Sequence, residues 1–122
     1  MDRSQQLNDA LNNLMAASAD IEACAAVTED GLIIASALPQ GMDEDHVAAI
    51  SSVMISMGVR ICTELDKKEL EQLFVKGKDG YIIMSHAGPH AVLVAMTRKE
   101  AKLGLIFLDM SRATDTLAEI LD

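Results

Sequence analysis

The chain has 122 residues, the length of one domain, with a hydrophobic fraction of 50% and a charged fraction of 24%. This composition excludes an intrinsically disordered chain, and the net charge of −9 argues against binding to nucleic acid, which needs a basic surface. With no Trp, one Tyr and two Phe, the core must consist of aliphatic side chains and methionines. We expect a single domain over residues 1–122.

The N-terminal segment, residues 4–18, predicts an amphipathic helix that Asp2 or Ser4 can cap. Its apolar residues repeat at the spacing of one helical face, at Leu7, Leu11, Leu14 and Met15. The segment is polar rather than signal-like, and no stretch reaches the roughly 20 apolar residues that span a bilayer. We therefore expect a cytoplasmic protein without membrane insertion, in which Cys24 and Cys62 are reduced, buried thiols.

Residues 21–36 predict a β-hairpin, because two β-prone runs flank the pair Asp30-Gly31. A loop follows over residues 37–42. Residues 43 to about 65 then predict the longest helix, with Asp43 as its N-cap and two further acidic residues in its first turn.

This long helix is apolar over more than one face. One face carries Val47, Ile50, Met54, Met57, Ile61 and Leu65. An adjacent face carries Ala48, Ile55, Val59 and Cys62. The remaining outer surface is small and weakly charged, and consists of Ala49, Ser52, Ser56, Arg60 and Thr63. Because a solvent-facing helix surface normally carries more charge, we predict that this surface contacts a partner.

Three more strands are predicted over residues 70–76, 81–87 and 91–97, followed by a helix over residues 103–121. The last two strands are apolar on both alternating faces and should be buried on both. The first carries charged residues and is typical of an edge strand. The predicted order is α-β-β-α-β-β-β-α, with helices covering both faces of a five-stranded sheet.

The sequence contains none of the motifs of a phosphate-binding loop, a nucleophile elbow or a zinc site. His86 and His90 are interpreted as turn histidines, and His46 as part of a capped helix start. Arg60 could act on a partner's phosphate, but a solvated arginine is favoured. We therefore expect no catalytic residues, no metal and no cofactor, and a small-ligand sensor or enzyme has little support.

In a monomer, the second apolar face of the long helix would be exposed to solvent, and the edge strand would have unpaired backbone N–H and C=O groups. A two-fold axis through this region would pair strand with strand and helix with helix. The sequence therefore predicts a homodimer with a continuous sheet. The predicted interface residues are Ile55, Val59, Cys62, Leu70, Glu71, Leu73 and Val75.

Three stretches together resemble the roadblock / dynein light chain family over nearly the whole chain: IEACAAVTEDGLIIAS, FVKGKDGYIIM and AVLVAMTRKEAKLGLI. The resemblance implies an α/β fold, a profilin-like three-layer α/β/α sandwich with an antiparallel sheet of order 2-1-5-4-3. It also implies dimers joined through the third strand and the second helix. The prokaryotic MglB-like members regulate small Ras-like GTPases, and their paired second helices form the platform that faces the GTPase.

On this resemblance, the platform corresponds to Ala49, Ser52, Ser56, Arg60 and Thr63. Activators of the family are thought to reposition the catalytic groups of the GTPase and to supply no arginine finger. The first hypothesis is therefore a homodimeric regulator or binding platform for a small Ras-like GTPase, which modulates its GTP hydrolysis or localisation. The alternative is a non-enzymatic homodimeric scaffold subunit in a signalling, motility or motor complex.

Overall fold

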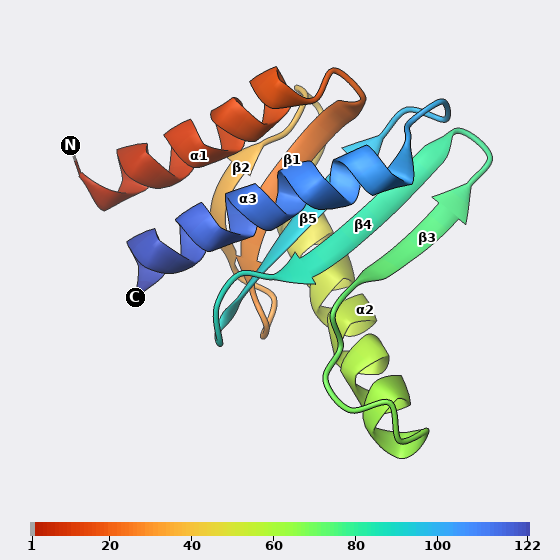
Figure 1. The fold of residues 1–122 in the computed structure, drawn as a ribbon. Helices are drawn as coiled ribbons and strands as arrows, with labels where there is room; N and C mark the ends of the chain where they lie inside the picture. The colour runs from red at the N-terminus through yellow and green to blue at the C-terminus, as the bar shows by residue number, and fades with distance from the viewer. Residues whose placement is uncertain (1) are drawn as a thin grey trace.

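A computed structural model describes residues 2–122 and contains the eight predicted elements in the predicted order (Figure 1). They are α1 (Arg3–Ala17), β1 (Ile21–Thr28), β2 (Ile33–Ala37), α2 (Glu44–Glu64), β3 (Leu73–Gly77), β4 (Gly80–His86), β5 (Ala91–Thr97) and α3 (Leu103–Leu121). The strands form one antiparallel sheet in the order β2-β1-β5-β4-β3. The predicted sheet order is confirmed, and β3 is an edge strand.

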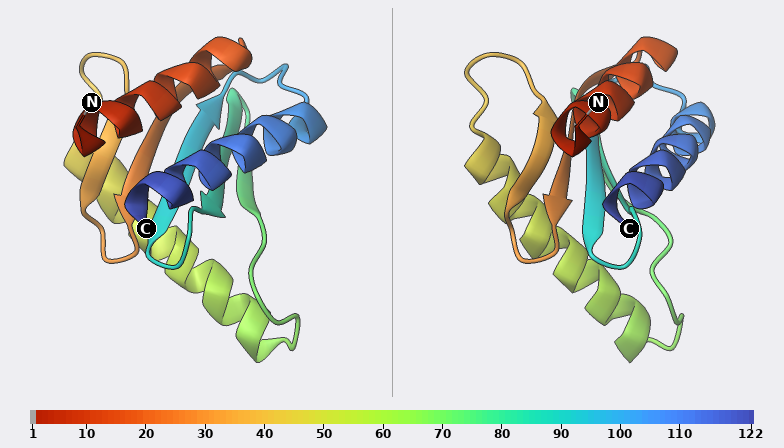
Figure 2. Two further views of the ribbon diagram at one scale, coloured as in Figure 1. Left: turned by 60° about the vertical axis from the view of Figure 1, so that its left-hand side comes forward. Right: turned by 90° about the vertical axis from the view of Figure 1, so that its left-hand side faces the viewer.

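The sheet lies between two helical layers. The helices α1 and α3 lie side by side on one face, and α2 crosses the other face alone (Figures 1 and 2). The N-terminal end of α1 is tied to the C-terminal end of α3, because Arg3 Nη2 donates a hydrogen bond of 2.8 Å to the Leu121 carbonyl. The three layers form the predicted α/β/α sandwich.

The central strands β1 and β5 separate two apolar cores. Leu11, Leu93 and Ile106 belong to the core under α1 and α3. Val27, Ile55 and Val94 belong to the core under α2. Every residue of β5 except the half-buried Met96 is buried, which confirms that this strand is covered on both faces. For β4 the same prediction is wrong, because only two of its residues are buried and Ile82 is exposed on the face of α2.

Both predicted N-caps are observed at the helix starts. Asp2 Oδ1 accepts a hydrogen bond of 2.8 Å from the Gln5 amide, and Asp43 Oδ1 accepts one of 2.9 Å from the Asp45 amide. The first strand after α2 is shorter than predicted, because β3 begins at Leu73 instead of residue 70. Leu70 lies in the preceding connection, packed toward α2, and therefore does not extend the sheet.

Helix α2 ends in a Schellman motif with a left-handed residue that is not glycine. The Asp66 amide donates to the Thr63 carbonyl, the Lys67 amide donates to the Cys62 carbonyl, and Asp66 has a φ of 60°. A left-handed backbone is strained for a residue with a Cβ, so this position favours glycine.

Asp66→Gly is expected to stabilise the fold by about 0.5 kcal/mol, since relief of this strain exceeds the added entropy of the unfolded chain. The measurement is the midpoint of urea unfolding at unchanged slope. Thr63→Gly, inside the last turn of α2, is the matched control and should destabilise by about 0.3 kcal/mol, because threonine is itself a weak helix former. A lower midpoint for Asp66→Gly would contradict the interpretation.

Candidate functional site

Helix α2 packs on the sheet through a stripe of mostly small residues. The buried residues of the helix are Val47, Ala48, Ser51, Ile55 and Gly58. At Gly58 the approach is close, because an added Cβ would lie 3.1 Å from Leu70 Cδ2 and 3.2 Å from Leu73 Cδ2. Small side chains here let the helix approach the connection to β3, and they make this the core-facing stripe.

A second stripe of large apolar side chains on α2 is exposed. Its exposed fractions are 44% for Ile50, 69% for Val53, 51% for Met57 and 48% for Ile61. Three of these residues share a helical face with Val47, as the sequence predicted, but of these four only Val47 is buried. By length and hydropathy alone α2 could cross a membrane. Its apolar character divides between the core stripe and this exposed stripe.

The exposed apolar region continues from α2 onto the sheet. The C-terminal half of α2 extends beyond the sheet (Figures 1 and 2), and on this face it leaves open the parts of β3 and β4 nearer their connecting turn. Val75 and Ile82, opposed across these strands, are 44% and 37% exposed on this side. A hollow of about 210 Å³ between α2 and β4–β5 is lined by Met42, His46, Val47, Ile50, Ser51, Ile82, Met84, Val94 and Met96. We call the α2 stripe with Val75 and Ile82 the apolar face.

The predicted interface residues divide into three groups. Val59, Glu71 and Val75 are exposed, and Glu71 precedes β3 rather than belonging to it. Cys62, Leu70 and Leu73 are half-buried. The prediction of a buried thiol is therefore wrong for Cys62. Ile55 is only 2% exposed and is a core residue of the protomer.

The predicted partner-facing residues share the other exposed side of α2. Ala49, Ser56, Arg60 and Thr63 are exposed there. Ser52 is half-buried, and its hydroxyl donates a hydrogen bond of 2.6 Å to the Glu29 carbonyl in the β1–β2 loop. The side chain of Arg60 pairs with Glu64 at 3.2 Å, but both are highly exposed, so the pair adds little stability.

The histidines and cysteines form no reactive cluster. His86 Nε2 lies 3.0 Å from Glu29 Oε1, and within residues 2–122 no group of three or more His, Cys, Asp or Glu side chains could hold a metal ion. The Cys24 thiol is buried and donates to the Leu11 carbonyl, and burial raises its pKa to about 11. It therefore stays protonated and unreactive at neutral pH.

The sequence missed Val53 and Ile82 as members of the apolar face. The available signal was the contrast between small and large residues on α2. The small residues Ala48, Ser51 and Gly58 recur at helical spacing and mark the side that approaches the rest of the protein closely. The large residues then remain for a second contact.

Comparisons with known proteins agree with this architecture. A family model described as the Roadblock/LC7 domain matches residues 7–97. The protein MJ0310 of Methanocaldococcus jannaschii is 37% identical over 91 residues, which cover 75% of this chain and 79% of that protein. MglB of Myxococcus xanthus superposes with a TM-score of 0.90 at 21% identity, over 99% of this chain and 91% of MglB.

A profilin shows the same fold at much lower sequence identity. Profilin II of Acanthamoeba castellanii superposes with a TM-score of 0.67 at 9% identity, over 93% of this chain and 97% of the profilin. At this identity the likeness concerns the fold alone, and it confirms the profilin-like sandwich.

Proposed function

This chain belongs to the Roadblock/LC7 domain family, and from that premise we propose that it is a homodimeric binding platform for a small Ras-like GTPase. The observation that carries the proposal is the apolar face, which joins the exposed stripe of α2 to an unpaired edge strand. Monomeric proteins rarely expose such a continuous apolar area beside open backbone hydrogen-bonding groups. A second copy of the chain can cover both at once.

The shape of the protomer supports a two-fold axis beside β3. Antiparallel pairing of two β3 strands would carry the sheet from one protomer into the next. The overhanging half of α2, with Met57 and Ile61, would then reach the open strip of the partner's sheet that contains Val75 and Ile82. Each helix would cover what the other protomer leaves exposed.

The GTPase is proposed to bind the small, weakly charged side of the paired α2 helices. Ala49, Ser56 and Thr63 present little steric bulk, and the charge of Arg60 is countered by Glu64. Such a surface suits contact with a protein over a broad area. The platform would act through this contact on the catalytic groups or the localisation of the GTPase.

Ser56→Asp is expected to weaken association with the GTPase at least ~10-fold, because the carboxylate would be desolvated in the contact. The test uses a purified small Ras-like GTPase from the same organism, loaded with GDP or a GTP analogue, and measures binding and the rate of hydrolysis. Glu119→Gln on α3, on the opposite side of the sheet, is the control and should bind like the wild type.

Two outcomes separate the hypotheses. Association of the wild type in either nucleotide state, weakened by Ser56→Asp, supports the GTPase platform. A stable dimer that associates in neither state rejects the platform and leaves the scaffold subunit as the function. Faster hydrolysis in the wild-type mixture would add an activating role.

A further inference from the structure

All three aromatic side chains of the chain meet at the β3 edge, on the face of the sheet opposite α2. The Phe74 ring centroid lies 6.1 Å from that of Tyr81 and 6.1 Å from that of Phe107 on α3. Lys76 Nζ lies 5.8 Å from the centroid of the Tyr81 ring. Phe74, although at the centre of this cluster, is 46% exposed. A large aromatic side chain is thus accessible to solvent on the edge strand, beside the core under α1 and α3.

The cluster is open because α3 covers the central strands and not the edge. In Figure 1, α3 lies over β5 and β4, and β3 lies beyond it. The start of α3 adds a further apolar side chain at Leu108, which is 49% exposed. At Gly104, one helical turn before Phe107, an added Cβ would meet nothing within 4 Å. The first turns of α3 therefore form one wall beside an uncovered aromatic strip.

The proposed dimer would turn this strip into a groove, so the inference rests on that part of the proposed function. Antiparallel pairing of two β3 strands would place the two Phe74 side chains on the same face of the joined sheet. The α3 helices of the two protomers would then stand on either side. The apolar face and the GTPase platform would lie on the opposite side of the sheet.

The charges around the strip are opposite in sign to the charge of the chain. Residues 73–80 and 102–108 contain three lysines, Lys76, Lys78 and Lys102, and one acidic residue, Asp79. None of the three lysines takes part in an ion pair among the described residues. In a protein with a net charge of −9, this region is locally basic and its ammonium groups are free for an incoming anion.

We propose that this surface binds an acidic segment of a partner protein that carries bulky apolar side chains. We call it the aromatic groove, and define it by Phe74, Tyr81, Phe107, Lys76, Lys78 and Lys102. The aromatic rings provide the apolar anchors, and the lysines attract the carboxylates and set the orientation. The dimer would thus bind two different proteins on its two faces.

The first test uses a probe peptide of about twelve residues with Leu at helical spacing and Glu elsewhere, without Tyr or Trp. Tyr81 is the only Tyr in a chain without Trp, so its fluorescence reports on the groove directly. We expect the acidic probe to change the Tyr81 fluorescence and to bind less tightly as salt increases. A matched probe with Lys in place of Glu, and vesicles of anionic lipid, should bind at least ~10-fold more weakly.

Gly104→Glu is the decisive variant, because the new side chain stands in open space and suits the first turn of a helix. The new carboxylate should weaken binding of the acidic probe at least ~10-fold through like-charge repulsion, whereas Gly104→Gln should change this binding less than ~3-fold. Lys76→Glu combined with Lys78→Glu should reverse the preference, so that the basic probe binds more tightly than the acidic probe.

The outcomes separate the groove from the proposed function. No response to the acidic probe, equal binding of both probes, or a stronger response to the vesicles would each overturn the groove. Dimer mass and GTPase association are measured on the same proteins and should be unchanged by Gly104→Glu. A monomeric wild type would reject the dimer itself, whatever the peptide result.

Discussion

Met57→Asp is expected to split the proposed dimer into folded monomers. Met57 lies in the middle of the exposed stripe on α2 and is 51% exposed, so a carboxylate there is solvated in the free protomer. In the dimer the same carboxylate would be buried against the partner without an opposite charge. The dissociation constant should rise at least ~100-fold, equivalent to about 2.7 kcal/mol.

Sedimentation velocity over a range of concentrations measures the effect, and circular dichroism verifies that the variant is folded. The adjacent Ser56→Asp is the matched control, since it adds the same charge on the other exposed side of α2 and should leave the dimer intact. Ile55→Asp is unsuitable as a test, because Ile55 is 2% exposed and the carboxylate would unfold the protomer. If the Met57→Asp dimer were as stable as the wild type, the exposed stripe of α2 would not be part of the interface.

The element order could be predicted because the hydrophobic periods are long and their ends are marked. The predicted bounds of α3 agree with the structure at both ends, since its apolar residues keep one helical register from Leu103 to Leu121. The start of α2 was fixed by the cap residue Asp43. The position of β5 could be predicted from an uninterrupted apolar run, which is typical of a strand covered on both faces.

The orientation of α2 could not be predicted, because its two apolar stripes are neighbours on the helix and periodicity does not distinguish them. Val47 and Ile50 belong to the same face in a helical projection, yet one is buried and the other is 44% exposed. The decision depends on how the helix crosses the sheet, which is a tertiary property. The start of β3 was missed for a similar reason, since Leu70 contributes to the packing against α2 instead of extending the strand.

The aromatic groove also lies beyond what the sequence could show. Phe74 and Tyr81 lie on the two strands of one predicted hairpin, but Phe107 comes from the distant last helix, and the three share no periodic pattern. They meet because the register of β3 and β4 opposes Lys76 to Tyr81, and because α3 lies over β4 and brings Phe107 beside this edge. Surface features that combine three elements in this way depend on the fold, even where each element is predicted correctly.

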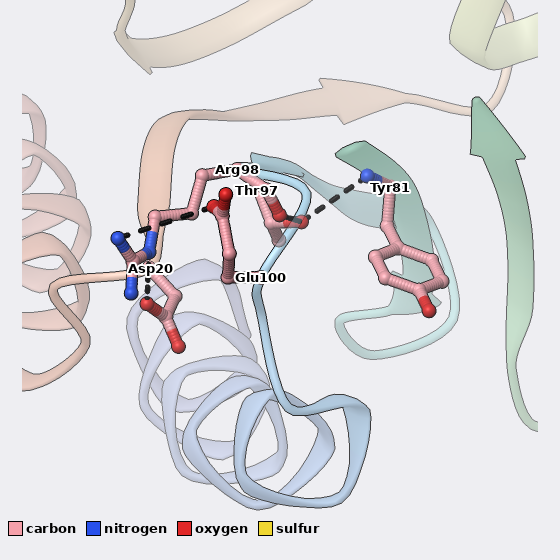
Figure 3. Close-up of polar contacts among 5 residues, drawn as sticks. All are labelled: Asp20, Tyr81, Thr97, Arg98 and Glu100. Atoms are coloured by element: carbon pink, nitrogen blue, oxygen red, sulfur yellow. Dashed lines mark hydrogen bonds and ion pairs between the residues drawn. The ribbon is translucent and has the colours of Figure 1, made fainter. Parts of the chain in front are cut away.

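Among the glycines, the first residue of β4 is the position where the backbone tolerates a side chain least. Gly80 has a φ of 149°, and an added Cβ would lie 1.9 Å from the Thr97 carbonyl oxygen. Thr97 itself is held, because its hydroxyl accepts from the Tyr81 amide at 3.1 Å and donates to the Arg98 carbonyl at 2.9 Å (Figure 3). Arg98 Nε in turn donates a hydrogen bond of 2.6 Å to Asp20 Oδ1, which joins the segment after β5 to the residue before β1.

Gly80→Ala is therefore expected to destabilise the protein by about 3 kcal/mol or more, since both the backbone angle and the overlap with Thr97 oppose a methyl group. Thermal and urea unfolding measure the loss. Gly41→Ala is the matched control: its φ of 93° is equally unsuited to alanine, but nothing lies within 4 Å of the added Cβ, so it should cost only about 1 kcal/mol. The difference between the two variants isolates the close approach of β4 to Thr97. Equal losses of stability in the two variants would mean that the backbone angle alone sets the cost, and that the chain at Thr97 can move away from the added methyl group.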